Sequence, residues 1–255
     1  RVGGSVQRAE PGSRGVVAFD VDGVLLRPLF LFQAARRMGL LVWLRVLLLG
    51  SLYKLGLVSV RAGVEGAYRA QRGVRVEDLL ALARELRFTR GAEKVFRVLR
   101  ETGYTLVLVS AGVPQQVIDV MADSLGADDA WGVLLEEEDG VLTGRLVGDR
   151  HTVHGKRLGL ERLIRGRGYA WNETTVVADD RSNEEIVEVA WRSVGINPEL
   201  PIRRKASFVI HTQDLREILE FFPEGYHSGI TPQWMAVRHE AFRKGIHACS
   251  VFMPI

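Results

Sequence analysis

Short apolar runs of four or five residues recur along the chain, separated by segments with helical periodicity. Their nearly continuous apolar character is typical of strands that are buried on both faces of a parallel sheet. The predicted strands are Val16–Phe19, Thr105–Val109, Thr175–Ala178, Ser193–Ile196 and Ser207–Ile210. The predicted helices between them are Gly91–Thr102, Pro114–Leu125, Lys156–Arg165 and Asn183–Trp191. This alternation predicts an α/β fold with a doubly wound, mostly parallel Rossmann-like sheet.

Two segments depart from the alternation. Glu136–Leu146 has Asp139-Gly140 at its centre, which predicts a β-hairpin. Residues 29–88 look helical throughout and lie between the first two strands, so we expect a helical cap inserted there. Part of this insert is strongly apolar, but Arg45 and Lys54 interrupt it, which favours a cap over a membrane span. The apolar excess leaves room for a surface that contacts lipid.

The composition of the segments suggests domain boundaries. We expect a disordered arm at 1–14, where the chain is polar and rich in glycine, and an α/β core formed by 15–28 and 89–222. The cap occupies 29–88. Residues 223–255 begin with turn-forming residues and become apolar, which predicts a linker and a C-terminal helix. A chain of 255 residues is long enough for one such domain with an insert.

Charge and cysteine content narrow the range of partners. The net charge is +3, and no dense basic block occurs, which argues against nucleic acid as a partner. The mild basicity suits phosphorylated substrates or an anionic membrane surface. Cys249 is the only cysteine, so an intrachain disulfide and a cysteine-built metal site are excluded. We expect a cytoplasmic protein that can associate with a membrane, through the cap or the C-terminal helix.

Two carboxylates end the first predicted strand in the sequence "FDVDGVL". Ligands of an open α/β sheet gather at the carboxyl ends of its strands, which is where Asp20 and Asp22 are expected. Carboxylates this close raise each other's pKa unless a cation neutralises them, and Mg²⁺ prefers such oxygen ligands. The alternative is an ordinary turn, since Asp and Gly are common turn residues.

Polar residues also follow the second strand. Ser110, Ala111 and Gly112 lie between that strand and a helix that is expected to start near Pro114. A hydroxyl group together with backbone N–H groups at a helix N-terminus suits a phosphate group. Lys156 lies at the opening of another predicted helix, where a cation opposes the helix dipole. It either has a separate role or is an exposed surface lysine.

A later strand repeats the pattern of the first. "TVVADDRSNEE" ends an apolar run in Asp179 and Asp180, and Asn183 follows near the start of a helix. If this strand neighbours the first, Asp179 lies beside Asp20. The alternative is N-capping of the helix, for which Ser182 is suited.

Taken in order, these four segments resemble the motifs of the haloacid dehalogenase superfamily of phosphohydrolases, in its phosphoserine-phosphatase-like branch. The resemblance extends from about Val16 to about Leu219 and includes the cap and the hairpin. It implies Asp20 as nucleophile and Asp22 as general acid/base. It also implies phosphate binding by Ser110, Ala111, Gly112 and Lys156, and Mg²⁺ binding by Asp20, Asp22 and Asp179. Asp180 and Asn183 would support the site.

The sequence departs from the family pattern in two places. The fourth motif usually carries a second Asp where this chain has Asn183, which predicts weaker Mg²⁺ binding. Phosphoserine phosphatases place an acidic residue shortly after the first motif to hold the substrate amine, whereas Arg27 is the only charge in Leu25–Phe32. We therefore expect Arg27 to influence specificity, and an acidic or lipid-like phosphate to be the substrate.

The C-terminal sequence "FRKGIHACSVFMP" is similar to the opening segment of membrane-embedded CTP-dependent polyprenol and phytol kinases. A docked C-terminal helix is the alternative.

The sequence supports two candidate functions. The first is a Mg²⁺-dependent phosphomonoester hydrolase that forms an aspartyl-phosphate and acts on a small phosphorylated substrate. The second is a catalytically weak, phosphate- or lipid-recognising head of a larger membrane protein.

Overall fold

A computed structural model describes residues 13–222 of the chain. Seven strands form one sheet in the order β4-β3-β2-β1-β5-β6-β7. The strands are β1 Val16–Asp20, β2 Thr105–Pro114, β3 Asp129–Glu138, β4 Val141–Val147, β5 Thr174–Ala178, β6 Arg192–Ile196 and β7 Phe208–Ile210. All neighbouring strands are parallel except β3 and β4. The predicted α/β fold with a mostly parallel sheet is therefore confirmed.

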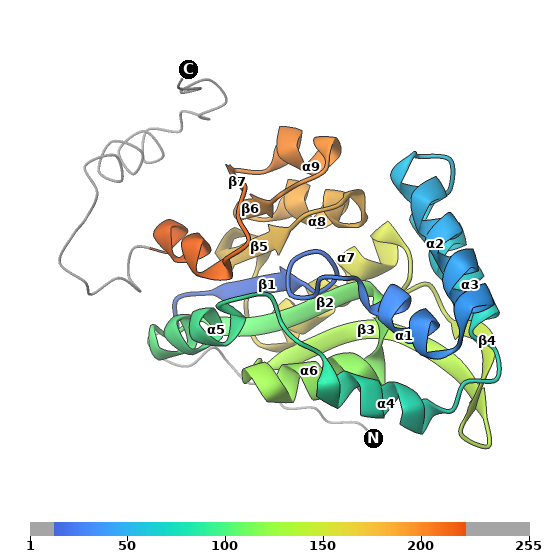
Figure 1. The fold of residues 1–255 in the computed structure, drawn as a ribbon. Helices are drawn as coiled ribbons and strands as arrows, with labels where there is room; N and C mark the ends of the chain where they lie inside the picture. Colours follow the sequence, from blue (N-terminus) through green and yellow to red (C-terminus); the bar gives the residue numbers. More distant parts are fainter. Residues whose placement is uncertain (1–12, 223–255) are drawn as a thin grey trace.

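Helices cover both faces of this sheet (Figure 1). Successive side chains of β1 point to opposite faces, because the side-chain period of a strand is two. Val17 and Phe19 face a cluster that includes α5 (Ala92–Glu101) and α6 (Gln115–Leu125). The opposite face packs against α7 (Val153–Gly166), α8 (Glu184–Val189) and α9 (Leu200–Lys205).

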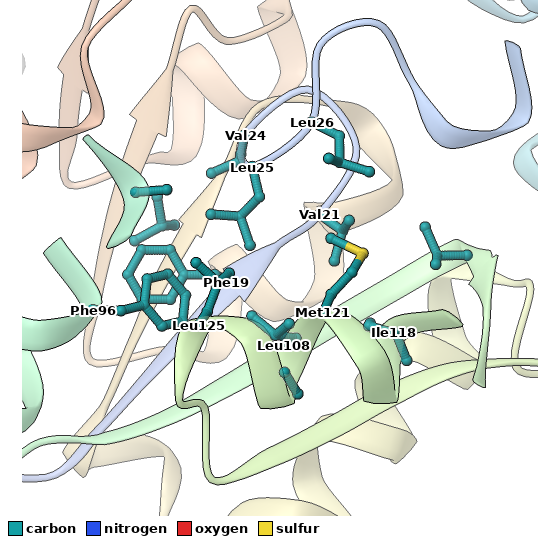
Figure 2. Close-up of a cluster of buried hydrophobic side chains, with 14 of the residues drawn as sticks. Phe19, Val21, Val24, Leu25, Leu26, Phe96, Leu108, Ile118, Met121 and Leu125 are labelled. Atoms are coloured by element: carbon teal, nitrogen blue, oxygen red, sulfur yellow. The ribbon is translucent and has the colours of Figure 1, made fainter. Parts of the chain in front are cut away.

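The larger cluster anchors the loop that follows β1. Figure 2 shows Val21, Val24, Leu25 and Leu26 of this loop above Phe19, with side chains of α5 and α6 around them. The rings of Phe19 and Phe96 lie 4.6 Å apart between centroids. The loop is thus held by burial of four apolar side chains, each of which is fully removed from water. This fixes the position of Asp22 within the loop.

The predicted hairpin is present, since Glu138 pairs with Val141 in the antiparallel pair of β3 and β4. β3 begins at Asp129, seven residues before the predicted hairpin. Its first half opens with Asp129 and is interrupted by Gly132, and the pattern missed it. β2 is also longer than predicted and runs to Pro114, with an irregular register after Val109.

Four helices occupy the predicted cap region: α1 (Phe30–Arg37), α2 (Leu40–Lys54), α3 (Val60–Ala70) and α4 (Val76–Glu85). Helices α1 to α3 lie beyond the carboxyl ends of β1 and β2 (Figure 1). The cap is thus located over the edge of the sheet where the predicted site residues lie. Within residues 13–222, no helix combines the length and the apolar character that crossing a bilayer would require.

The predicted ends of the chain are described only in part. Residues 1–12 of the predicted arm, and the predicted linker and C-terminal helix at 223–255, lie outside the described residues. The last two residues of the predicted arm are in contact with the core. Ser13 Oγ and the Arg14 N–H both donate to the Gly103 carbonyl, at 3.3 and 3.0 Å.

Candidate active site

Three adjacent strands bring the predicted acidic and hydroxyl residues to one edge of the sheet. Asp20, the last residue of β1, pairs with Val109 of β2, so Ser110 lies one residue beyond it. On the other side of β1, Phe19 pairs with Val177 of β5, and Asp179 follows one residue after the end of β5. The central position of β1 in the strand order explains why segments far apart in the sequence meet around Asp20.

Asp20 is buried and is bound by three donors. Its Oδ1 accepts from Lys156 Nζ and from the Val21 N–H, each at 2.8 Å, and its Oδ2 accepts from Asn183 Nδ2. Burial raises the pKa of Asp20, while the positive charge of Lys156 acts in the opposite direction. The carboxylate is thus held in one orientation, with its charge balanced by one buried cation.

Lys156 is not an exposed surface lysine: its side chain is fully buried. Helix α7 begins at Val153, three residues earlier than predicted, because Thr152 Oγ caps it by accepting the Gly155 N–H at 2.8 Å. Lys156 therefore lies at the end of the first turn. In addition to its bond to Asp20, its Nζ donates to Asn183 Oδ1 at 2.6 Å. These acceptors offset the unfavourable position near the helix N-terminus.

Asp20 belongs to a cluster of three acidic residues. Carboxylate oxygens of Asp20, Asp179 and Asp180 all lie within 4.8 Å of one another. Asp179 Oδ1 is buried and has no hydrogen-bond partner among the described residues. Burial, followed by the charges of Asp180 and Asp20, raises the pKa of Asp179 well above its usual value. An unpaired buried oxygen within three clustered carboxylates fits a hard divalent cation such as Mg²⁺.

Gly23 makes room for this cluster. It has a φ of +86°, and a Cβ atom there would lie 1.8 Å from Asp179 Oδ2. The loop after β1 can therefore pass over Asp179 only if this position carries no side chain. The glycine of "DVDG" therefore allows the loop after β1 to lie close to Asp179, in addition to forming a turn.

Asp180 supports the cluster and caps the short 3₁₀ helix Arg181–Asn183. Its Oδ1 accepts from the Ser182 N–H at 3.0 Å and from Ser182 Oγ at 2.6 Å. Its Oδ2 accepts from Tyr53 of α2 at 3.0 Å. Asp180, and not Ser182, is therefore the residue whose side chain caps this helix. Ser182 donates its N–H and its hydroxyl group to Asp180.

Asp22 lies between the sheet and the cap. Its Oδ1 accepts the Phe30 N–H at the start of α1, at 2.6 Å. Burial raises the pKa of Asp22 to about 7, and the charges of Asp20 and Asp180 act in the same direction. A carboxyl group with this pKa can both donate and accept a proton near neutral pH.

The segment after Ser110 is folded around its hydroxyl group. Ser110 Oγ accepts the N–H groups of Gly112 and Val113, each at 3.0 Å. The Gly112 carbonyl accepts from Tyr68 of α3 at 2.6 Å. Ser110, Ala111 and Gly112 all line the pocket described next. The N–H group of Gly112, which was expected to face a phosphate, is bound by Ser110 instead.

A pocket of about 690 Å³, including its open mouth, lies between the sheet edge and the cap. Its floor consists of Asp20, Asp22, Ser110, Ala111, Gly112, Asp180 and Ser182. The cap contributes Leu29, Leu31, Phe32, Val46, Leu49, Gly50, Tyr53, Val60, Gly63, Val64 and Ala67. None of these cap residues carries a charge. The pocket is therefore polar at the sheet edge and apolar elsewhere.

The structure does not bring Arg27 to this pocket. Its Nε donates to the Gly23 carbonyl at 2.8 Å, and its Nη1 lies 3.5 Å from Gln213 Oε1, and it is not among the residues that line the pocket. Conversely, sequence reasoning missed Tyr53 and Tyr68. Their hydroxyl groups bind the sheet edge from helices whose sequence pattern shows only apolar packing, so no signal in the sequence pointed to them.

Comparisons with known proteins agree with this geometry. The family model described as haloacid dehalogenase-like hydrolase matches residues 17–182. A phosphoserine phosphatase of Archaeoglobus fulgidus is 27% identical over 78% of this chain, and one of Streptomyces coelicolor is 31% identical over 53%. The chain spans 57% and 33% of the length of these two relatives.

Among solved structures, a substrate-bound phosphoserine phosphatase superposes with a TM-score of 0.75. The match covers 83% of this chain and 99% of the other, at 23% identity, and therefore concerns the fold. The family match includes both Asp20 at one end of the site and Asp179 at the other. The chain belongs to the haloacid dehalogenase-like hydrolase family and, within it, is similar to the phosphoserine phosphatases.

Proposed function

We propose that this protein is a Mg²⁺-dependent phosphomonoester hydrolase that acts through an aspartyl-phosphate on Asp20. One observation carries the proposal: the buried ion pair of Asp20 and Lys156, at 2.8 Å, borders both the carboxylate cluster and the floor of the pocket. A nucleophile, a balancing cation and a cation site thus meet where a substrate can enter.

Asp20 and Asp179 would hold the Mg²⁺ ion, with Asp180 as a third carboxylate and the backbone carbonyl of Asp22 as a further ligand. When bound, the ion neutralises the repulsion between the phosphate oxygens and the attacking carboxylate. The unpaired Asp179 Oδ1 supports this assignment, since an all-oxygen donor set suits Mg²⁺.

The reaction takes place in two steps at phosphorus. An oxygen of Asp20 forms a bond to phosphorus, the bond to the ester oxygen breaks, and protonated Asp22 gives its proton to the leaving alcohol. Water then attacks the phosphorus of the aspartyl-phosphate, and Asp22 accepts a proton from it as phosphate leaves. The pKa of about 7 for Asp22 suits both directions of transfer.

Lys156 and Ser110 serve the phosphoryl group. Lys156 favours the ionised form of Asp20, and its charge stabilises the negative charge that builds up during transfer. The Ser110 hydroxyl, at the floor of the pocket, would donate to a phosphoryl oxygen while its lone pairs keep the loop at Ala111 and Gly112 in shape.

The apolar wall of the pocket supports a substrate with an apolar organic group. Phosphoserine, on which the named relatives act, carries an ammonium group that needs an acidic partner. No residue that the cap contributes to the lining, within residues 13–222, is acidic. Burying an unpaired charge there would be costly. An alkyl or other lipid-like phosphate instead places its apolar part against residues such as Leu31, Phe32 and Leu49.

A panel of phosphomonoesters tests the proposal. With Mg²⁺ present, kcat/KM should rise across alkyl phosphates of increasing chain length and should be lowest for phosphoserine. Asp20→Asn should abolish hydrolysis of every compound. Phosphoserine as the best substrate would refute the substrate class, and hydrolysis that persists in Asp20→Asn would refute the mechanism.

A catalytically weak recognition head is the second candidate, because Asn183 occupies the place of an acidic residue. The side-chain amide of Asn183 is fully engaged in the site: Nδ2 donates to Asp20, and Oδ1 accepts from Lys156 at 2.6 Å. The two functions separate in the same panel, since a recognition head would bind alkyl phosphates without releasing phosphate. Contact of the cap with a membrane surface, expected from the sequence, is compatible with either function.

A further inference from the structure

Helix α2 carries apolar side chains on both of its faces. Its inner face contributes Val46, Leu49 and Tyr53 to the pocket. Its outer face consists of five leucines whose exposed fractions lie between 39% and 74%: Leu40, Leu41, Leu44, Leu47 and Leu48. Leu55 and Leu57, directly after the helix, are 72% and 70% exposed. Soluble monomers rarely expose apolar side chains in such a continuous group.

The five leucines form one stripe. At 3.6 residues per turn, they fall within about 120° of the helix circumference. The same spacing puts Arg45 beside one edge of the stripe and Lys54 beside the other, each within about 40° of the nearest leucine. Both basic residues are exposed. An apolar stripe bordered on both sides by cations is the pattern of a helix that lies in the plane of a membrane surface.

The sequence segment that contains α2 carries only positive charges. Between Gly23 and Val64 the chain contains six arginine and lysine residues and no acidic residue. Arg36 and Arg37 of α1 are exposed at the start of α2. Acidic residues of neighbouring elements are engaged: Glu65 binds Arg61 at 2.9 Å and His151 at 3.1 Å, and Glu85 binds Arg37. Glu199 interacts with Lys54, and Asp180 accepts from Tyr53 of α2.

We propose that the outer face of α2, together with Leu55 and Leu57, docks on the surface of an anionic lipid bilayer. The leucines would enter the boundary between headgroups and acyl chains, while Arg45 and Lys54 contact anionic headgroups. Charge complementarity selects this occupant: a second copy of the chain would bring the same cationic edge against itself, whereas anionic lipid is attracted to it.

Docking of this kind would bring the pocket close to the membrane. The consequence for catalysis rests on the proposed function. One helix would touch the bilayer with its outer face and enclose the apolar wall of the pocket with its inner face. An amphiphilic phosphate embedded in the membrane would therefore have a short path to Asp20. The docking itself does not depend on catalysis, so the two are tested separately.

Flotation with vesicles of phosphatidylcholine and phosphatidylglycerol tests the docking. The full chain should float with anionic vesicles, float weakly with pure phosphatidylcholine, and lose binding as salt is raised. The double variant Leu44→Glu/Leu48→Glu should reduce binding more than tenfold. The matched control is Leu158→Glu/Leu200→Glu, at leucines that are 51% and 52% exposed on α7 and α9, and it should bind as the wild type does.

Hydrolysis of a soluble phosphate ester such as p-nitrophenyl phosphate keeps the two proposals apart. Leu44 and Leu48 do not line the pocket, so the variant should retain this activity while it loses vesicle binding. Equal vesicle binding by the wild type and Leu44→Glu/Leu48→Glu would overturn the docking proposal, as would a wild type that does not bind. Self-association that is lost in the variant, without vesicle binding, would identify the surface as an interface between copies and would also overturn it.

Discussion

Lys156 and Asp20 form a buried ion pair: Nζ and Oδ1 are 2.8 Å apart, and the side chains are 0% and 4% exposed. Desolvating two charges is costly, and their attraction repays that cost only when further hydrogen bonds complete the geometry. Asn183 provides these bonds, because its amide bridges the two side chains. The arrangement holds the Asp20 carboxylate in one orientation at the floor of a pocket, and the charge of Lys156 opposes the rise in its pKa that burial causes.

Replacing Lys156 by methionine tests the cation of this pair. Lys156→Met keeps the length of the side chain and removes its charge, so kcat should fall by about 10²–10³ and inhibition by inorganic phosphate should weaken. Steady-state kinetics with phosphate as competitor measure both effects. Lys94→Met, at an exposed position of α5, is the control and should change neither. Unchanged phosphate inhibition in Lys156→Met would contradict the proposed role of Lys156.

Gly23→Ala tests the close approach of the loop to Asp179. The new Cβ would overlap Asp179 Oδ2, so the carboxylate cluster should be displaced and Mg²⁺ binding, measured by calorimetry, should weaken by at least tenfold. Gly73→Ala is a matched control, because Gly73 has a similar φ of +89° but open space around its Cβ position. Both variants incur the strain of a positive φ, of about 1 kcal/mol, and only Gly23→Ala should lose Mg²⁺. Equal Mg²⁺ affinity in the two variants would contradict the assignment.

The metal-free protein should become less stable as the pH rises. Burial raises the pKa of Asp22 from 3.8 to about 7, and the pKa values of Asp20 and Asp179 also rise. A raised pKa stabilises the folded state fully below about pH 4, and this contribution is lost as the pH rises through 7. Since a metal ion displaces protons from its ligands, the gain in Tm on adding Mg²⁺ should increase over the same range.

Thermal unfolding in EDTA and in Mg²⁺, from pH 5 to pH 8, measures this difference, at pH values chosen around the titration of Asp22. Asp179→Asn is the control: its stability in EDTA should fall less with pH, and its Tm should respond less to Mg²⁺. A Tm gain from Mg²⁺ that is the same at all pH values would count against the carboxylate cluster as the binding site.

Much of the fold and the site could be predicted from local sequence, for identifiable reasons. Strands buried on both faces leave continuous apolar runs, so β1 and β5 and the acidic residues at their ends were recognisable. The start of β3 was missed because Asp129 and Gly132 break up its apolar residues. The contacts of Tyr53 and Tyr68 with the sheet edge depend on how the cap packs, which no local pattern encodes. The position of Arg27 outside the pocket lining has the same cause, since the fold of its loop decides where its guanidinium points.

Asn183→Asp tests the departure in the fourth motif. An aspartate can still accept from Lys156, but it loses the donor to Asp20 and adds a fourth negative charge to the cluster. Tm in EDTA should therefore fall, while the affinity for Mg²⁺ should rise by about tenfold, equivalent to 1.4 kcal/mol. Asn172→Asp, at an exposed position, controls for the added charge. A Mg²⁺ titration that is identical in Asn183→Asp and the wild type would show that Asn183 does not limit metal binding.

Trapping the covalent intermediate tests the central claim most directly. The protein is mixed with Mg²⁺ and a phosphate monoester, quenched, reduced with borohydride and digested, and the peptide that contains Asp20 is examined by mass spectrometry. The account predicts that Asp20, and not Asp22, is converted to homoserine, the product of reducing an acyl phosphate, and that this requires the ester. Hydrolysis of the ester with Asp20 unmodified, or with the modification on another carboxylate, would contradict it.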